Sequence, residues 1–434
     1  MNLLILGSGA REHAFCYFIA KNPSIGQIYV APGNGGTSSC AVNVNINPLD
    51  FESVWDFCIA NDVSTIIPCN EDPLVNGIVD FIQHKNMTTG IDIIAIGPNA
   101  YASQLEGSKD FAKNFMDRNN IPTAKYKTFD ENNVHSVESY LDEITPPYVL
   151  KADGLAAGKG VVITSDKQEA LQLVNEMILN KMFGEASKKV VIENFLQGIE
   201  ISVFAITDGV NYKILGSAKD YKQIFEGDKG PNTGGMGAIS PVPFADSDFI
   251  QKVEDRILKP TLLGLENENN PFQGFLFLGL MNCNNEPYVI EYNVRMGDPE
   301  TEAIFPRLKV DLLNLLQAIP EKKIDHVELF YDQRVAATVY LVSEGYPGEY
   351  PKGIPVSINT ESNGDDIFLF HGGTKQIENN QIVTNGGRVL AVTCLANNLN
   401  EAIEKSQKTA SLIAFQGVYF RKDIGNDLLT YTHN

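Results

Sequence analysis

The sequence predicts a multidomain protein of mixed α/β and α+β class, with an N-terminal parallel-sheet (Rossmann-like) domain and later units built on antiparallel strands. Three observations predict this fold class. The chain has 434 residues, 43% of them hydrophobic, which suits roughly two to four domains with buried cores. Strands alternate with helices up to residue 105. Later strands come as hairpins separated by long glycine-rich loops.

The N-terminal domain is predicted over residues 1–105. Its strands are expected at Leu3–Leu6, Gln27–Ala31, Ser64–Pro68 and Ile91–Gly97, with helices from about residue 10 to Lys21 and over Asp50–Asn61. Ligands of a parallel sheet bind at the carboxyl ends of its strands, so the candidate loops are residues 7–11, 32–37 and 70–73.

The first of these loops, Gly7-Ser8-Gly9-Ala10-Arg11, invites a dinucleotide interpretation. Glu12 occupies the third glycine position of that fingerprint, and no carboxylate ends the second strand to bind a ribose. A glycine loop with Arg11 at a helix N-terminus suits a single phosphate instead. Tight turns without a ligand are the alternative, but three convergent loops favour phosphate binding.

The central domain is predicted over residues 106–325, with a small flap subdomain at about 122–193. A helix is expected to open within Gln104–Lys109 and run to about Asn119. Further elements are predicted as strands at Tyr148–Ala152, Gly160–Thr164 and Lys189–Glu193 and a helix over Lys167–Asn180. Between the first two strands, Lys151–Gly160 is a run of small residues flanked by lysines. Its amides can approach phosphates closely, which favours a nucleotide flap over a structural turn.

Two further segments of this domain suit a nucleotide site. The strand ending at Glu193-Asn194-Phe195-Leu196 can offer main-chain groups to an adenine edge, with Glu200 placed for ribose hydroxyls, although a solvated acid is the alternative for Glu200. The polar, glycine-rich loop 226–237 suits a lid or a substrate pocket.

A hairpin of Gln273–Cys283 and Tyr288–Arg295 carries the metal-binding hypothesis. Side chains alternate along a strand, so Glu291, Asn293 and Arg295 are expected on one face, about 7 Å apart. Carboxylate and amide oxygens are hard ligands for Mg²⁺ or Mn²⁺, and a guanidinium suits a phosphate oxygen. An internal Glu–Arg ion pair is the alternative.

The C-terminal unit, residues 326–434, is predicted to be a compact α+β domain. Strands are expected at Arg334–Val342, Ile367–Phe370 and Arg388–Ala396, followed by a helix from Asn398 to about Phe415 with Glu401 in capping-box position.

Composition limits the function classes. The formal net charge of −20 argues against a nucleic-acid partner, although a local cation cluster can still bind a small anion. The six cysteines form no C-x-x-C pair and are expected to be free thiols of a reducing compartment. The apolar start, interrupted by Gly7, is expected to be a strand and not a signal peptide. No run reaches membrane-spanning length. We expect a cytoplasmic monomer without a membrane partner.

Together, the glycine flap between lysines and the Glu-x-Asn strand resemble the ATP-grasp superfamily of carboxylate–amine ligases. Longer motifs narrow the resemblance to the phosphoribosylamine–glycine ligase (glycinamide ribonucleotide synthetase) family. They span nearly the whole chain: Pro32–Thr37, Leu105–Lys109, Lys151–Gly160, Gly230–Gly237, Arg295–Glu300 and Phe370–Thr374.

The resemblance implies ATP, Mg²⁺ or Mn²⁺, glycine and 5-phosphoribosylamine as ligands. The residues it implies for ATP are Lys109, Lys151, Gly158, Lys159, Gly160, Glu193, Asn194, Phe195, Leu196 and Glu200. Those for the acceptor and glycine are Gly9, Arg11, Asn34, Gly35, Glu71, Asp220, Lys222, Gly235, Met236, Arg295 and Asp298. Glu291 and Asn293 would hold the metal, and Arg295 and Lys151 would be catalytic.

The chain departs from the family pattern at a few positions. Tyr221 and Gln223 stand where the family often has His and Arg, Asn70 replaces a usual Pro, and Gly373 replaces another small residue. Gln223 removes a cation near the substrate. The resemblance implies ligation of glycine to 5-phosphoribosylamine through glycyl phosphate, in purine biosynthesis. The alternatives are another ATP-grasp ligase or a carboxylase that adds bicarbonate, a nicotinamide-dependent oxidoreductase, and a non-catalytic nucleotide-binding module.

Overall fold

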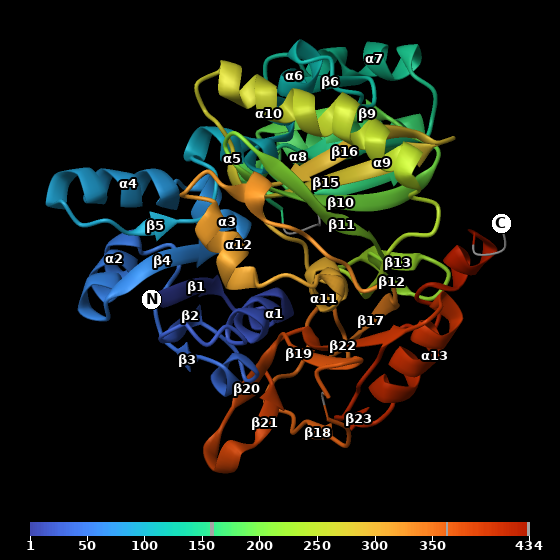
Figure 1. Cartoon of the computed structure of the whole chain (residues 1–434). Coiled ribbons are helices and arrows are strands. Elements are labelled where there is room, and N and C mark those ends of the chain that lie inside the picture. The colour runs from blue at the N-terminus through green and yellow to red at the C-terminus, as the bar shows by residue number, and fades with distance from the viewer. Residues whose placement is uncertain (157–159, 362, 432–434) are drawn as a thin grey trace.

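The structure of the protein, a computed structural model, describes residues 1–156, 160–361 and 363–431. Figure 1 shows the N-terminal unit in blue at the left, the middle of the chain above it, and the C-terminal unit in orange and red below. The predicted ATP-binding residues Gly158 and Lys159 lie outside the described residues.

The N-terminal unit is a five-stranded sheet of strand order β3-β2-β1-β4-β5, parallel as predicted, in which β3 is a strand that the sequence did not predict. Its strands are β1 (Asn2–Gly7), β2 (Ile28–Pro32), β3 (Val42–Asn43), β4 (Val63–Pro68) and β5 (Ile94–Ala95), and its helices are α1 (Ala10–Ile19), α2 (Phe51–Ala60), α3 (Glu71–Val75) and α4 (Ile78–Thr89). Residues 3–6 are fully buried, which explains the continuous apolar run. The strand predicted at 91–97 is only two residues long, because β5 pairs with β4 at just two positions on the sheet edge.

The helix predicted to open within Gln104–Lys109 is in fact two helices, α5 (Ala100–Gly107) and α6 (Lys109–Arg118). Ser108 separates them in an extended conformation, and its Oγ accepts a hydrogen bond from the Phe111 N–H at 3.0 Å. This N-cap interaction starts α6 and places Lys109 in its first turn.

The flap subdomain is a four-stranded antiparallel sheet of order β6-β9-β7-β8. Its elements are β6 (Tyr126–Asp130), α7 (Val137–Glu143), β7 (Tyr148–Ala152), β8 (Val161–Thr164), α8 (Lys167–Ile178) and β9 (Lys189–Asn194). Its buried apolar residues form a cluster separate from the main core. The subdomain can therefore behave as a packing unit of its own.

An eight-stranded antiparallel sheet, β16-β15-β10-β11-β14-β17-β22-β19, runs through the rest of the chain. Its strands are β10 (Ile199–Asp208), β11 (Tyr212–Asp220), β14 (Gly237–Ser240), β15 (Gln273–Cys283), β16 (Glu286–Asn293), β17 (Val335–Val342), β19 (Ile367–His371) and β22 (Arg388–Ala396). Because β14 pairs with β17, the boundary predicted at residue 325 falls within one continuous sheet.

Helices and short hairpins complete this part of the chain. They are the hairpin β12 (Gln223–Phe225) and β13 (Lys229–Asn232), α9 (Ser247–Val253), α10 (Lys259–Asn267), α11 (Glu300–Ile304), α12 (Leu312–Ala318), β18 (Ser357–Ile358), β20 (Thr374–Gln376), β21 (Ile382–Thr384), α13 (Leu399–Ala410) and β23 (Ile413–Ala414). Helices α9 and α10 lie over β15 and β16 (Figure 1). Asn398 caps α13 by accepting from the Glu401 N–H at 3.0 Å, as its spacing predicted. Among the described residues, none of the helices has the length and apolar character required to cross a bilayer.

The end of β16 differs from the expectation. The strand stops at Asn293, so Arg295 lies beyond it and not on the strand face with Glu291 and Asn293. The pairing with β15 also shifts register between Val289 and Glu291, which makes Ile290 an extra residue in the ladder. A local bulge of this kind frees the Ile290 carbonyl to bind a side chain.

Candidate active site

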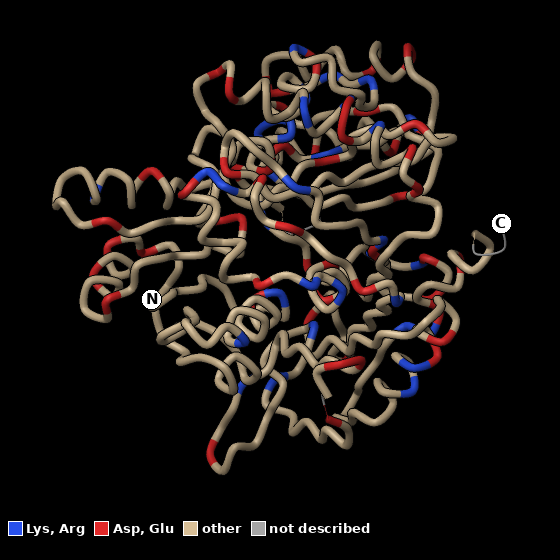
Figure 2. Tube along the Cα trace, viewed as in Figure 1, with Lys and Arg blue, Asp and Glu red and all other residues tan. Residues whose placement is uncertain are grey.

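A cavity of about 650 Å³ lies between the N-terminal loops, helix α6, the flap sheet and strands β10, β11 and β16. Although the chain carries a net charge of −20, many cations gather around it. They are Arg11, Lys109, Lys113, Lys151, Lys222, Arg295 and Arg388. Figure 2 shows acidic and basic residues interspersed where the upper and lower halves of the molecule meet. The site therefore combines cations for an anionic substrate with acids that hold those cations.

A buried triad lines one end of the cavity. The carboxylate of Glu193 lies 2.9 Å from Lys113 Nζ and 2.9 Å from Lys151 Nζ, and all three side chains are at most 6% exposed. Burial lowers the pKa of Lys113 to about 8 even though Glu193 opposes the shift. Lys151 Nζ also donates to the Ile290 carbonyl at 3.2 Å. The Glu193 side chain thus positions Lys151, which leaves the main chain of the 193–196 linker to meet a ligand.

Lys109 lies across the cavity from this triad. Its Nζ donates to the Gly154 carbonyl at 3.3 Å, and its N–H donates to the Asp153 carbonyl at 3.0 Å. Burial and the nearby Lys151 charge lower the pKa of Lys109, while Glu291 opposes the shift. These contacts connect the first turn of α6 to the start of the flap, so Lys109 and the flap lie beside the same space.

Lys222 lies within a cluster of acidic residues that line the cavity beside β10, β11 and β16. Its Nζ is 2.9 Å from Glu200 and 3.9 Å from Glu291. Burial opposes its charge, but Glu200, Asp220 and Glu291 raise the pKa of Lys222 well above its usual value. Burial raises the pKa of Asp220. Four predicted residues therefore meet in one cluster, although the chain places them on three strands and a loop.

Glu291 and Asn293 present two hard oxygens to the cavity, as the alternation predicted. The described residues contain no group of three or more His, Cys, Asp or Glu with the spacing of a metal site. The protein alone therefore offers an incomplete set of ligands. This donor set fits a cation that is also held by phosphate oxygens, because Mg²⁺ binds through one or two protein oxygens plus substrate phosphates and water.

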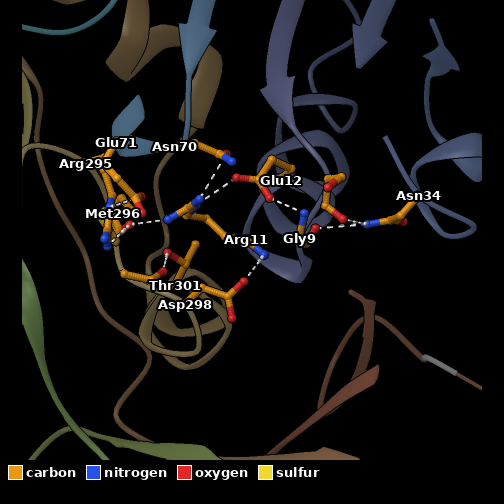
Figure 3. A network of polar contacts seen from close by, with 12 residues as sticks. Gly9, Arg11, Glu12, Asn34, Asn70, Glu71, Arg295, Met296, Asp298 and Thr301 are labelled. Atoms are coloured by element: carbon orange, nitrogen blue, oxygen red, sulfur yellow. Dashed lines mark hydrogen bonds and ion pairs between the residues drawn. The ribbon is translucent and has the colours of Figure 1, made fainter. Parts of the chain in front are cut away.

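Figure 3 shows the network at the other end of the cavity, where the first glycine loop meets the segment after β16. Arg11 Nε donates to Glu12 at 2.8 Å, Nη1 to the Met296 carbonyl at 3.0 Å, and Nη2 to Asn70 at 3.2 Å. The Gly9 N–H donates to Glu12. With these partners, Arg11 fixes the wall of the pocket and holds two distant segments together.

Arg295 lies beside this wall and takes part in a second ion-pair network. Its Nη2 donates to Glu106 at 2.7 Å and to Asn293 Oδ1 at 3.2 Å, and its Nε lies 3.4 Å from Glu71. The Val294 N–H also donates to Glu106 at 2.7 Å. Burial raises the pKa of Glu106 to about 7, while Arg295 opposes the shift. The Nε of Arg295 is buried and faces Glu71 without a well-formed hydrogen bond, so the ion pair with Glu71 is the looser of its two carboxylate contacts.

Arg388 brings the C-terminal unit to the site. From the start of β22, its Nη1 donates to the carbonyls of Gly234 at 2.5 Å and Asp298 at 2.8 Å, and it lies 3.1 Å from the Asp298 carboxylate. At Gly235, which has a φ of +116°, a Cβ would lie 2.4 Å from Pro299. The glycine-rich loop is therefore packed against the segment after β16, and Arg388 holds both.

Most of the predicted site residues line this one cavity. Those that do are Gly9, Arg11, Glu71, Lys109, Lys151, Gly160, Glu193, Asn194, Phe195, Leu196, Glu200, Asp220, Lys222, Glu291, Asn293, Arg295 and Asp298. Four others, Asn34, Gly35, Gly235 and Met236, are absent from the lining. Asn34 instead ties loops together, since its Nδ2 donates to the carbonyls of Ser8 and Gly9 at 3.0 Å each.

Sequence reasoning missed the roles of Glu106, Lys113 and Arg388. Lys113 follows Lys109 by four residues, and this helical spacing would have placed both on one face of α6. Glu106 was part of a recognised motif but had no role assigned to it. Arg388 carries no local signal, because its partners lie about ninety residues or more away in the chain.

Comparisons with known proteins agree with this architecture. Family models match all three units: the N domain of phosphoribosylglycinamide synthetase over residues 1–106, its ATP-grasp (A) domain over 107–301, and its C domain over 336–427. The chain is 41% identical over 430 residues to the phosphoribosylamine–glycine ligase of Chlorobaculum tepidum, covering 98% of this chain and 99% of that protein.

Two further similarities extend the comparison. A bifunctional purine biosynthetic protein of Schizosaccharomyces pombe is 41% identical over 98% of this chain, and the chain spans only 53% of that longer protein. The crystal structure of phosphoribosylamine–glycine ligase from Thermotoga maritima superposes with a TM-score of 0.82 at 33% identity, covering 98% of this chain and 100% of that one.

The flap sheet, the large antiparallel sheet, the lysine-lined cavity between them and the family match over residues 107–301 define a protein of the ATP-grasp class. Within that class, the chain belongs to the phosphoribosylglycinamide synthetase family.

Proposed function

We propose that this chain ligates glycine to 5-phosphoribosylamine with ATP, giving glycinamide ribonucleotide, ADP and phosphate for purine biosynthesis. The observation that carries the proposal is one cavity with two different ends. Lysines and an apolar-lined linker form one end, and the glycine loops with Arg295 and Asp298 form the other. This division supports a site that takes a nucleotide at one end and a phosphorylated amine at the other, with Glu291 and Asn293 also in the lining.

The nucleotide end suits ATP. Lys109 and Lys151 supply charge for the phosphates, and the main chain of residues 194–196 offers groups for adenine. Asn194 Oδ1 is buried without a hydrogen-bond partner among the described atoms, so a bound base would satisfy it. Phe195 and Leu196 supply apolar surface beside it, as expected for a base-binding pocket.

The reaction follows from the chemistry of a carboxylate, whose own leaving group would be oxide. An oxygen of the glycine carboxylate attacks the γ-phosphorus of ATP, and ADP leaves. The amine of phosphoribosylamine then attacks the carbonyl carbon of glycyl phosphate, phosphate leaves, and the new amide nitrogen loses a proton. Lys151 and Arg295 neutralise charge that develops on the transferred phosphoryl group and on the carbonyl oxygen. Positioning contributes the rest.

A divalent cation, Mg²⁺ or Mn²⁺, would be held by Glu291 and Asn293 and would neutralise phosphate charge when bound. Lys222 would compete with it for Glu291, since the two side chains are 3.9 Å apart. Replacement of Glu291 by Gln removes the charge of one proposed ligand, so it should raise the concentration of cation needed for half-maximal activity. Near-normal turnover of this variant at limiting Mg²⁺ would refute the metal role.

The decisive experiment is a coupled ADP assay with each substrate left out in turn. ADP should form only when glycine and phosphoribosylamine are both present, with glycinamide ribonucleotide as the product. ADP release that is independent of either substrate would refute the assignment. Turnover with bicarbonate instead of glycine would identify a carboxylase, and ATP binding without turnover would identify a binding module.

Further expectations concern assembly and motion. We infer a cytoplasmic monomer with an N-terminal domain over residues 1–105 and a flap subdomain at about 122–193, which sedimentation and limited proteolysis would test. Because β14 pairs with β17, we expect no separate domain to be released by cleavage near residue 325. The sequence predicts that the flap at 154–160, of which residues 157–159 lie outside the described residues, closes over ATP and excludes water from the acyl phosphate. Unchanged cleavage of this segment by protease when ATP is added would argue against closure.

A further inference from the structure

Two cysteines that the ligation chemistry does not use meet in the N-terminal domain. Cys16 lies on α1 and is fully buried, whereas Cys40 follows the short helical turn at Thr37–Ser39 and is half-buried. Their Sγ atoms are 2.7 Å apart, although the residues are 24 positions apart in the chain. The sulfur atoms of a disulfide are about 2.05 Å apart, so a bond between them requires only a small side-chain shift.

The main chain around Cys40 holds this arrangement in place. The Cys40 and Ala41 N–H groups both donate to the Thr37 carbonyl, at 3.2 Å and 2.8 Å. Thr37 in turn donates its N–H to Asn34 Oδ1 at 3.0 Å. The main chain that carries Cys40 is therefore held in an ordered turn, which keeps the two side chains within reach of each other.

The two thiols are also chemically unequal. Hydrogen bonds from Cys16 and Ser39 lower the pKa of Cys40, although burial opposes the shift. Its contact with Cys40, together with burial, raises the pKa of Cys16. Cys40, which is more exposed and has the lower pKa, is the better attacking thiol. Once Cys40 has formed a mixed disulfide with a small molecule, the buried Cys16 is placed to attack it and release that molecule.

We propose that Cys16 and Cys40 are a redox-responsive pair that closes to a disulfide with a small disulfide such as glutathione disulfide as oxidant. The Cys40 thiolate attacks one sulfur of glutathione disulfide, and the first glutathione leaves as a thiolate. Cys16 then gives up its proton, attacks the Cys40 sulfur and releases the second glutathione. Two protein thiols are oxidised, and one glutathione disulfide is reduced to two glutathione molecules.

The disulfide would tie α1 to the loop that carries Asn34. This loop already reaches the first glycine loop, because Asn34 donates to the carbonyls of Ser8 and Gly9. A cross-link between segments that are already in contact leaves the folded arrangement in place and restricts the unfolded chain. Oxidation should therefore stabilise the N-terminal domain, raising its melting temperature by roughly 5 °C or more.

The test treats the native full-length protein with millimolar glutathione disulfide, quenches free thiols with an alkylating agent, and maps disulfide-linked peptides by mass spectrometry. A Cys16–Cys40 link should appear, with two fewer of the six thiols alkylated, and dithiothreitol should reverse it. The melting temperature should rise in the oxidised sample. Cys40→Ser should lose both effects.

Cys283→Ser is the matched control, because Cys283 is also half-buried but lies far away on β15. This variant should form the link as the parent protein does. The proposal fails if the native protein keeps a mixed glutathione disulfide at Cys40 without the link, or if the link forms only in urea. An unchanged melting temperature in the linked protein would refute the stabilising effect. None of these measurements depends on the ligation reaction.

Discussion

Glu193→Gln tests whether the buried triad, and not the linker alone, positions Lys151, the lysine that we propose binds the ATP phosphates. The substitution keeps shape but removes the charge that lies 2.9 Å from both Lys113 and Lys151. Lys113 has a pKa of about 8 in the folded protein against 10.5 for the free side chain, so its burial as a cation already costs about 3 kcal/mol at pH 7. Without the Glu193 charge, the two buried ammonium groups lose the carboxylate that contacts both of them.

The free energy of unfolding should fall by about 3 kcal/mol. This value is at the low end of the range for breaking a buried ion pair, because the Gln carbonyl still accepts one hydrogen bond. Urea unfolding at pH 7 measures it. Lys151 would also lose its anchor, so kcat/KM for ATP should fall at least about tenfold, which corresponds to about 1.4 kcal/mol. The KM for glycine should change little.

Two further variants make the result interpretable. Glu286→Gln is the matched control, because Glu286 also contacts two cations, Lys252 and Arg256, but is 41% exposed. It should cost much less than Glu193→Gln, because solvent screens an exposed ion pair. Lys113→Met combined with Glu193→Gln should restore about 2 kcal/mol relative to Glu193→Gln alone, because one unpaired charge is gone. Equal losses for Glu193→Gln and Glu286→Gln would refute the reasoning.

The same triad predicts a pH effect with a definite sign. The folded pKa of Lys113 lies below its unfolded value, so between about pH 8 and 10.5 the unfolded chain binds more protons than the folded one. The contribution of Lys113 to the free energy of unfolding should therefore rise with pH over that window. In Lys113→Met this rise should be smaller, as urea unfolding at pH 8 and pH 9.5 would reveal.

Three more expectations follow from other parts of the molecule. Burial raises the pKa of Glu106 to about 7, so kcat/KM should decrease as the pH falls below about 7. In Glu106→Gln this decrease should be smaller, and the maximal kcat/KM should be lower. Burial lowers the pKa of His13 to about 3, so between pH 6.5 and 3 this residue gains a proton only in the unfolded chain. Lowering the pH from 6.5 to 5 should therefore cost about 2 kcal/mol in the free energy of unfolding, as measured with urea. This loss should be smaller in His13→Asn and the same as in the parent protein in His326→Gln, which replaces an exposed histidine. Gly237→Ala should lower the free energy of unfolding by at least about 2 kcal/mol, because the new Cβ would lie 2.4 Å from the Thr338 carbonyl, between the paired strands β14 and β17. Thermal or urea unfolding measures this loss. A change below about 0.5 kcal/mol would show that the two strands separate easily.

The elements that the sequence predicted well are those with a local signal. The range predicted for β15, Gln273–Cys283, is reproduced, because continuous apolar residues and a following Asn-Asn turn mark it without reference to the rest of the chain. The Asn398 cap of α13 is equally local. The alternation that placed Glu291 and Asn293 on one face held, since the bulge at Ile290 precedes both residues.

The features that the sequence could not predict depend on contacts between distant segments. Glu193 was expected at the adenine, but the fold brings Lys113 and Lys151 to its carboxylate from a helix and a neighbouring strand. Arg295 was expected on β16, but the strand ends at Asn293 because Glu106, from α5, accepts both the Val294 N–H and the Arg295 guanidinium. An acid almost 190 residues away thus determines where the strand stops.

The hydrophobic core is divided into two clusters, and this division predicts which part of the chain should move when ATP binds. The flap sheet has its own buried cluster, whereas the N-terminal unit, the large sheet and the C-terminal strands share one core, and β14–β17 pairing joins the last two. Closure over ATP should therefore be a motion of the flap sheet against everything else. The Lys113–Glu193 ion pair crosses that boundary, because Lys113 lies on α6 and Glu193 on β9. Its loss should loosen the flap sheet as well as displace Lys151, which explains why we expect one substitution to weaken both folding and ATP binding.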